Sequence, residues 1–66
     1  MSVAKVIEIH SEGKSIEAAA EAALIETARS VDGIMNLYLQ DIQAIVEDNR
    51  IIKYRLNAKV TFLVQS

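Results

Sequence analysis

The last third of the sequence alternates between apolar and polar residues almost without interruption. Its apolar positions are Ile52, Tyr54, Leu56, Ala58, Val60, Phe62 and Val64. Its polar positions are Lys53, Arg55, Asn57, Lys59, Thr61 and Gln65. Successive side chains of a strand point to opposite faces of a sheet, so the pattern predicts one long strand over residues 50–65 with two unlike faces. Such a strand is too long for a small chain to cover alone, and we expect it to contact another chain.

Size and composition also indicate that the protein needs partners. The chain has 66 residues, of which 52% are hydrophobic, and this length predicts a single domain over residues 1–66. A domain of this size buries only about 60% of the surface that its unfolded chain exposes. Cysteine is absent, which excludes disulfides and thiolate zinc sites. We therefore expect a homo-oligomer, in which neighbouring subunits supply the missing burial.

The charge pattern argues against nucleic acid and membrane partners. The net charge is −2, and the basic residues are scattered rather than gathered in a patch. No apolar run approaches the ~20 residues of a membrane span. The N-terminus lacks the charged and then apolar layout of a signal peptide. We expect a cytoplasmic protein.

The first half of the sequence predicts a strand followed by a helix. Val3–His10 is apolar and β-branched enough for a strand, and Ser11–Lys14 is expected to be a loop with Gly13 as its flexible point. Ser15 fits a helix N-cap, and the alanine- and glutamate-rich stretch 16–32 fits the helix. Gly33 fits the C-terminal end of this helix. The stripe expected to face the core is Ile16, Ala20, Ala23, Leu24, Thr27 and Val31.

A second long strand, Ile34–Glu47, should form a hairpin with the last strand. Asp48-Asn49 fits a two-residue turn, which places Glu47 opposite Arg50. The same register predicts the pairs Leu37–Val60, Met35–Phe62, Leu39–Ala58 and Ile45–Ile52. It collects an apolar face of Met35, Leu37, Leu39, Ile45, Ile52, Leu56, Ala58, Val60 and Phe62, where the helix should pack. It collects a polar face of Asn36, Tyr38, Gln40, Arg55, Asn57 and Lys59.

The predicted fold is therefore α+β, with the order β-α-β-β and a three-stranded antiparallel sheet packed on one helix. A helix of ~17 residues spans roughly 26 Å, whereas a strand of ~14 residues spans roughly 46 Å. The helix thus covers little more than half of the hairpin. The uncovered part, near Ile45, Ile51, Ile52 and Tyr54, needs a neighbouring chain.

Three ordered motifs resemble the dodecin family. Residues 3–9, VAKVIEI, are similar to the family's V-x-K-V-I-E-[LIV] start, and residues 15–19, SIEAA, are similar to its S-[WIF]-E-x-A. Residues 54–62, YRLNAKVTF, resemble its Y-x-V-x-[LV]-K-V-x-F. The resemblance covers nearly the whole chain and implies a hollow homododecamer that binds a small ligand, typically a flavin such as riboflavin or FMN.

Two positions depart from the flavin-binding pattern of that family. Asn36 stands where the resemblance implies a tryptophan that stacks on the flavin, and Arg55 stands where it implies a glutamine. Asparagine offers no broad apolar face for stacking. The sequence is at least as similar to a tryptophan-less, calcium-associated branch, a resemblance that includes residues 30–34. Calcium is therefore a second candidate ligand.

The candidate ligand-binding residues are Asn36, Gln40, Arg55 and Asn57, which share the predicted polar face. Arginine suits phosphate and carboxylate because its donors form a rigid fork, so the ligand would be small and anionic or planar. The alternative is that Arg55 pairs with a carboxylate of another subunit.

The candidate metal ligands are Asp41, Glu47 and Asp48. Hard cations need several oxygen ligands, and no calcium-binding loop motif is present, so symmetry-related chains would have to contribute. The alternative is ordinary solvated charge at a hairpin tip.

No arrangement of residues predicts catalysis. His10 is the only histidine, and the serines have no visible base beside them. We therefore expect a non-enzymatic protein that binds or stores a small ligand or ion. A flavin-binding dodecin and a structural or partner-binding oligomer without a ligand remain the alternatives.

Overall fold

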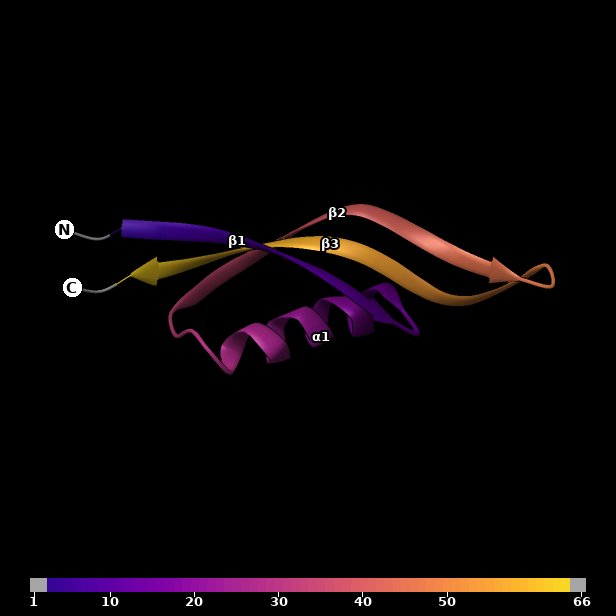
Figure 1. Ribbon diagram of the computed structural model, residues 1–66, viewed down its shortest axis with the longest axis horizontal. Helices are drawn as coiled ribbons and strands as arrows, with labels where there is room; N and C mark the ends of the chain where they lie inside the picture. The colour runs from indigo at the N-terminus through magenta and orange to yellow at the C-terminus, as the bar shows by residue number, and fades with distance from the viewer. Residues whose placement is uncertain (1–2, 65–66) are drawn as a thin grey trace.

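The computed structural model describes residues 3–64 and has the expected element order (Figure 1). Strand β1 is Val3–Gly13, helix α1 is Ile16–Ala28, strand β2 is Ile34–Glu47 and strand β3 is Arg50–Val64. The sheet order is β1-β3-β2, and both pairings are antiparallel. The predicted α+β fold is thus confirmed; Gln65, which we assigned to the last strand, lies outside the described residues. None of the described helices is long and apolar enough to cross a membrane.

The first strand is longer than predicted, because Ser11–Gly13 pairs with β3 instead of forming a loop. Gly13 lies opposite Tyr54, and the Ser11 hydroxyl donates a hydrogen bond of 2.7 Å to the Ala19 carbonyl. A Cβ on Gly13 would lie 2.5 Å from the Ala19 backbone nitrogen. Glycine is therefore required here for close packing of strand and helix, and not for flexibility.

The helix begins where the sequence predicts and ends earlier. The Ser15 hydroxyl accepts a hydrogen bond of 3.0 Å from the Ala18 backbone N–H, as expected of an N-cap. The regular helix ends at Ala28, and not near Asp32 as predicted. The chain must turn back toward β2 within a few residues, and Gly33 makes this turn with a φ of +73°. This left-handed backbone favours glycine.

The core lies between α1 and the middle of the sheet. Three small helix residues, Ala19, Ala23 and Thr27, are buried against it. The buried strand residues are Leu56, Ala58 and Val60 of β3. The predicted helix stripe was right for Ala23 and Thr27, missed Ala19, and was wrong for Ile16 and Leu24, which are 37% and 39% exposed. Small side chains at the contact allow the helix to approach the sheet closely.

The hairpin register is confirmed in its middle and at its tip. Leu37 pairs with Val60, Leu39 with Ala58 and Glu47 with Arg50. Asp48 and Asn49 have φ values of 52° and 60°, as a two-residue turn with left-handed central residues requires.

Two predicted pairs are wrong because the strands contain bulges. Phe62 pairs with Ile34 instead of Met35, and Ile45 pairs with Lys53 instead of Ile52. Register shifts lie between Ile34 and Asn36, between Gln40 and Gln43, and between Ile45 and Val46. A one-residue shift moves the following side chains to the other face of the sheet. Ile45 therefore lies on the face of Lys53 and does not continue the apolar face under the helix.

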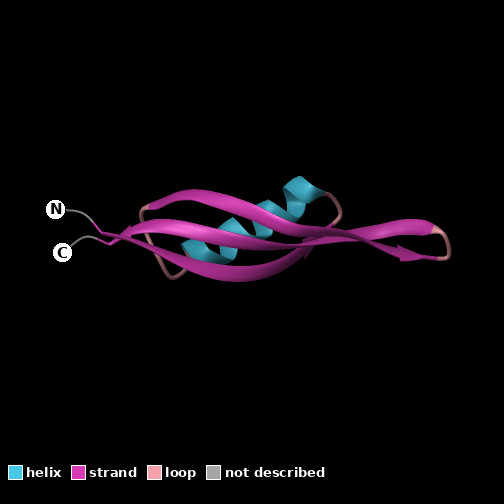
Figure 2. Ribbon diagram, turned by 90° about the horizontal axis from the view of Figure 1, so that it is seen from above, coloured by secondary structure: helices cyan, strands magenta, loops and turns pink. Residues whose placement is uncertain are grey.

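The far end of the hairpin projects as a two-stranded arm beyond the rest of the molecule (Figure 2). Gly13, the last residue of β1, pairs with Tyr54, so residues 45–53 have no third strand beside them. The molecule measures 52 × 19 × 13 Å. We call residues 45–53 the arm.

Candidate binding face of the sheet

The sheet face turned away from α1 carries most of the charged and amide side chains of the strands. Leu56, Ala58 and Val60 are buried under the helix, so the alternate residues of β3 point to the opposite face. Pairing adds the neighbouring residues of β1 and β2 to this face. Its polar members are Glu8, His10, Glu12, Asn36, Tyr38, Gln40, Gln43, Lys53, Arg55, Asn57, Lys59 and Thr61. We call it the polar face.

An ion cluster marks the end of the polar face next to the arm. The Glu12 carboxylate accepts a bond of 3.0 Å from Lys53 Nζ and one of 3.2 Å from Arg55 Nε, each to a different oxygen. All three side chains are between 39% and 47% exposed. The hydrogen bond from Lys53, followed by that from Arg55, lowers the pKa of Glu12 below its usual range. Glu12 is thus held as an anion that fixes two cations.

Two further side-chain contacts connect the strands on this face. Gln40 Nε2 donates to Glu8 at 3.4 Å, and Asn57 Nδ2 donates to Asp41 at 3.0 Å. Asp41 has a φ of 54°, a left-handed conformation that aspartate tolerates better than most residues. Asp41 lies in the bulge between Gln40 and Gln43, where β2 has two residues opposite Leu56. The bond from Asn57 therefore holds the bulge to the central strand.

Two open hollows lie beside this cluster. One, of about 520 Å³, is lined by His10, Ser11, Glu12 and Arg55. The other, of about 540 Å³, is lined by His10, Asp41, Ile42, Gln43, Arg55 and Asn57. Both share His10 and Arg55, so these two residues lie between them. The two hollows together are lined by hydrogen-bond donors and acceptors and by side chains of both charges. The site is shallow, and a neighbouring subunit could close it.

The structure brings together three of the four predicted ligand-binding residues. Gln40 and Asn57 are direct cross-strand partners, and Arg55 lies two residues further along the same face. Asn36 shares the face but pairs with Thr61, six residues along β3 from Arg55. At 3.3 Å per residue this separation is roughly 20 Å. Asn36 therefore lies apart from the group of polar side chains around Arg55.

Sequence reasoning missed the partners that define this surface. Arg55 does pair with a carboxylate, but Glu12 belongs to the same chain and not to another subunit. Glu12 was assigned to a loop, so its position opposite Arg55 was not foreseen. The signal was present in the alternation of Glu8, His10 and Glu12, which extends the first strand to Gly13.

The candidate metal ligands do not meet within one chain. Asp41 lies in the bulge, whereas Glu47 and Asp48 lie at the hairpin turn, six and seven residues away. Among residues 3–64, no three acidic or histidine side chains are close enough to hold a metal ion. A site that uses these residues would need oxygen ligands from several copies.

Comparisons with known proteins agree with this fold. The Dodecin family model matches residues 3–65. Two crystal structures of mutant Thermus thermophilus dodecin, one arginine-to-alanine and one tryptophan-to-phenylalanine, have TM-scores of 0.91 and 0.90, with 19% identity over 100% of both chains. A crystal structure of a protein from the same organism has a TM-score of 0.91 and 19% identity, covering 100% of this chain and 98% of that one. No curated protein matches. The family model covers nearly the whole sequence, and the chain therefore belongs to the Dodecin family.

Proposed function

We propose that this protein is a non-enzymatic, cytoplasmic homododecamer that binds and stores a small anionic or planar ligand on the polar face of its sheet. Membership of the Dodecin family supports a small-ligand-binding oligomer. The incomplete burial of the single chain supports assembly, because twelve large hydrophobic side chains among residues 3–64 are more than a third exposed.

The main support for ligand binding is the preorganised group of polar side chains around Arg55. Its Nε is engaged by Glu12, and its terminal nitrogens carry four further N–H donors in a fixed plane. Asn57 is held by Asp41 in the adjacent hollow. A side chain that is already ordered loses little entropy when a ligand arrives, which favours binding. A phosphate or carboxylate group suits such a planar set of donors.

Flavins provide a direct test, since FMN and riboflavin differ by a single phosphate. We expect FMN to bind more tightly than riboflavin in a fluorescence-quenching titration. Arg55→Ala should weaken FMN binding about tenfold, the loss of a charge-assisted bond of roughly 1.4 kcal/mol, while the dodecamer persists in light scattering. Lys14→Ala, which removes an exposed cation outside the polar face, is the matched control. Equal affinities for the two flavins, or unchanged FMN binding in Arg55→Ala, would refute this site.

The position of Asn36 restricts how a flavin could bind. Asn36 lies roughly 20 Å along the sheet from Arg55 and has no aromatic ring. A stacked flavin would therefore need another aromatic surface, and Tyr38 on β2, which is 61% exposed on the polar face, is the candidate. Tyr38→Ala should lower the affinity for riboflavin and FMN equally if the ring is the platform.

Calcium is the alternative ligand, held by Asp41, Glu47 and Asp48 from neighbouring subunits. A ligand bound only by the folded assembly raises its melting temperature. If calcium is stored, EDTA should lower the melting temperature and added calcium should restore it, whereas an Asp48→Asn variant should no longer respond.

One observation favours a second function, that of a structural or partner-binding oligomer without a ligand. Glu12 already satisfies the charge of Arg55 within the chain, so no ligand is required to neutralise it. Under this alternative, FMN and calcium both leave the melting temperature unchanged. Glu12→Ala separates the two functions further, since it removes the carboxylate that orders Arg55 and should change FMN binding only if Arg55 contacts the ligand.

A further inference from the structure

The arm exposes apolar side chains that no other part of residues 3–64 covers. Val46 and Ile51 form a cross-strand pair near the tip, and they are 59% and 57% exposed. Ile52, beside them, is 41% exposed. An isolated two-stranded hairpin is only marginally stable in water, and the arm has neither a third strand nor the helix against it. The arm is therefore built to lie against another surface.

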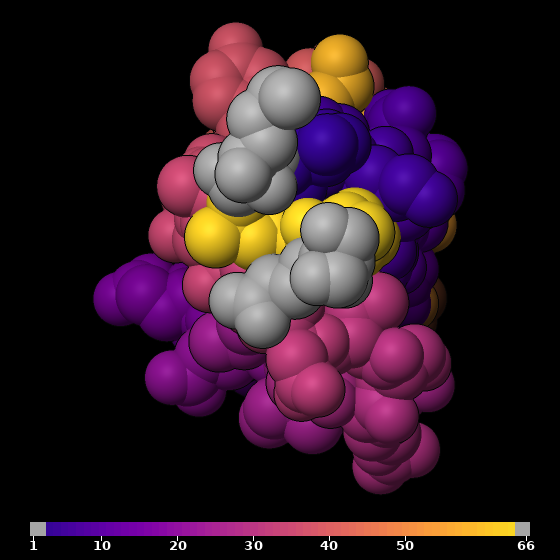
Figure 3. Space-filling view, turned by 90° about the vertical axis from the view of Figure 1, so that its left-hand side faces the viewer, coloured from indigo at the N-terminus to yellow at the C-terminus, as the bar shows by residue number. Residues whose placement is uncertain are grey.

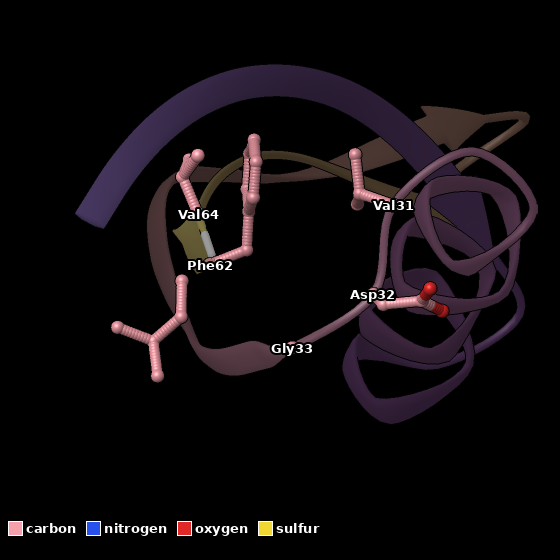
Figure 4. Close-up of a pocket in the computed structure, with 6 residues that line it drawn as sticks. Val31, Asp32, Gly33, Phe62 and Val64 are labelled. Carbon is pink, nitrogen blue, oxygen red and sulfur yellow. The ribbon is translucent and has the colours of Figure 1, made fainter. Parts of the chain in front are cut away.

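A hollow with several apolar side chains in its lining lies at the opposite end of the molecule. It has a volume of about 380 Å³ and is lined by Val31, Asp32, Gly33, Phe62, Leu63 and Val64. Figure 4 shows the side chains of Val31, Phe62 and Val64 on the same side of the Gly33 segment, with the Asp32 carboxylate turned away from Phe62. In Figure 3 the end of β3 lies between β1 and the segment that follows the helix. The hollow thus combines the apolar side chains of Val31, Phe62 and Val64 with an acidic residue, Asp32, at its edge.

The arm and the hollow of one chain cannot meet. The arm forms one end of a molecule 52 Å long, while the segments that line the hollow, residues 31–33 and 62–64, lie toward the opposite end (Figure 1). A contact between them must therefore join two copies, and it is heterologous because the two surfaces differ. Heterologous contacts close into rings or continue as filaments.

The charges around the two surfaces are complementary. Glu47, Asp48 and Arg50 surround the tip of the arm. At the hollow, Asp32 stands on the rim, and Lys5 lies beside Phe62 as its pairing partner in β1. A cation at the tip can therefore face the acid at the rim, while the acids at the tip face Lys5.

From these observations we propose that the arm of each subunit inserts the Val46–Ile51 pair into the Val31–Phe62–Val64 hollow of a second copy, with Arg50 next to the partner's Asp32. This contact goes beyond the proposed ligand binding and rests only on the chain being a homo-oligomer. If light scattering shows an oligomer but the crosslinking described below finds no contact between arm and hollow, this interface is wrong and the proposed ligand binding is unaffected.

Thiol crosslinking tests the contact directly, because the chain has no cysteine of its own. Ile51→Cys and Val64→Cys variants are co-expressed, and the assembly is treated with a short bis-maleimide and separated on a denaturing gel. We expect a covalent dimer that mass spectrometry identifies as one copy of each variant. Neither variant alone should give this dimer. Lys14→Cys paired with Val64→Cys is the matched control and should give none.

Three results would overturn the proposal. Ile51→Cys crosslinking to itself would show that two arms pair with each other. A folded assembly without a mixed dimer would show that the arm lies elsewhere. A small molecule retained by the hollow in native mass spectrometry, and lost in Val64→Asp, would show that a ligand occupies it. As a second measurement, Asp32→Arg and Arg50→Asp should each reduce assembly at low salt, and the double variant should recover it.

Discussion

The two halves of the long hairpin differ in what stabilises them. In the half next to α1, β3 is the central strand of three, and Leu56, Ala58 and Val60 are completely buried. In the arm, two strands pair with each other alone, and Val46 and Ile51 remain more than half exposed. The same alternating sequence pattern thus runs through both regions. In one region the chain buries its own apolar side chains, and in the other it leaves them exposed. The first region defines the subunit, and the second requires an assembly.

The boundary between these halves is marked by bulges in both strands. Asp41 and Ile42 together oppose Leu56 on β2, and the shift between Ile45 and Val46 leaves Ile52 as the extra residue on β3. Bulges bend strands and increase their twist. The second shift restores the register that the first one changed, so the turn at Asp48-Asn49 keeps the pairing predicted from it. The bulges therefore change the direction of the arm without altering the strand pairing at its tip.

The largest expected contrast comes from placing one charge in each half. Val60→Asp buries a carboxylate on the helix side of the sheet without a partner. This should cost more than about 4 kcal/mol of unfolding free energy, which approaches the whole stability of a small domain. We expect this variant to lack native circular dichroism. Ile51→Asp, in the arm, should keep a native spectrum and form smaller particles in light scattering. Native, assembled Val60→Asp protein would show that the face assignment is wrong.

The next contrast compares the two glycines of the covered half. Gly13→Ala places a methyl group 2.5 Å from the Ala19 backbone nitrogen, and it should cost about 1–3 kcal/mol through displaced backbone. Gly33→Ala meets nothing closer than 3.3 Å, and its φ of +73° costs about 1 kcal/mol. The midpoint of urea unfolding should therefore be lower for Gly13→Ala than for Gly33→Ala. The reverse order would show that backbone conformation matters more than contact here.

Sequence reasoning predicted this fold where local patterns and turn chemistry agree. Alternation identified β3 and its faces, Ser15 identified the start of the helix, and Asp48-Asn49 set the register of the tip. It failed at the bulges that contain Asp41 and Ile52, because assigning faces by alternate positions assumes that neither strand holds an extra residue. It also failed at Glu12, whose partners lie more than forty residues away in sequence. Long-range pairing of this kind follows only from the assembled sheet.

The bulge next to the arm contains Asp41, which accepts the bond from Asn57. Asp41→Ala removes the acceptor of the Asn57 bond and places alanine at a φ of 54°, so it should cost about 1–2 kcal/mol. Asp41→Asn keeps an acceptor and tolerates the conformation, and it should cost far less in the same urea titration. Asp41→Gly separates the causes, since it relieves the backbone but loses the bond. If all three variants unfold at the wild-type midpoint, the bulge contributes nothing to stability.

The smallest expected effect is the pH dependence of the Glu12 cluster at the base of the arm. Bonds from Lys53 and Arg55 lower the pKa of Glu12, so the unfolded chain binds this proton more readily than the folded one. The stabilisation is therefore present at neutral pH and fades as the pH falls below the usual carboxyl range, near 4.5. Glu12→Gln should lower the urea midpoint at pH 7 and match wild type increasingly closely toward pH 3. Glu21→Gln, on the exposed face of α1, should show no such convergence. A constant gap between wild type and Glu12→Gln across this range would mean that Glu12 acts through packing and not through its charge.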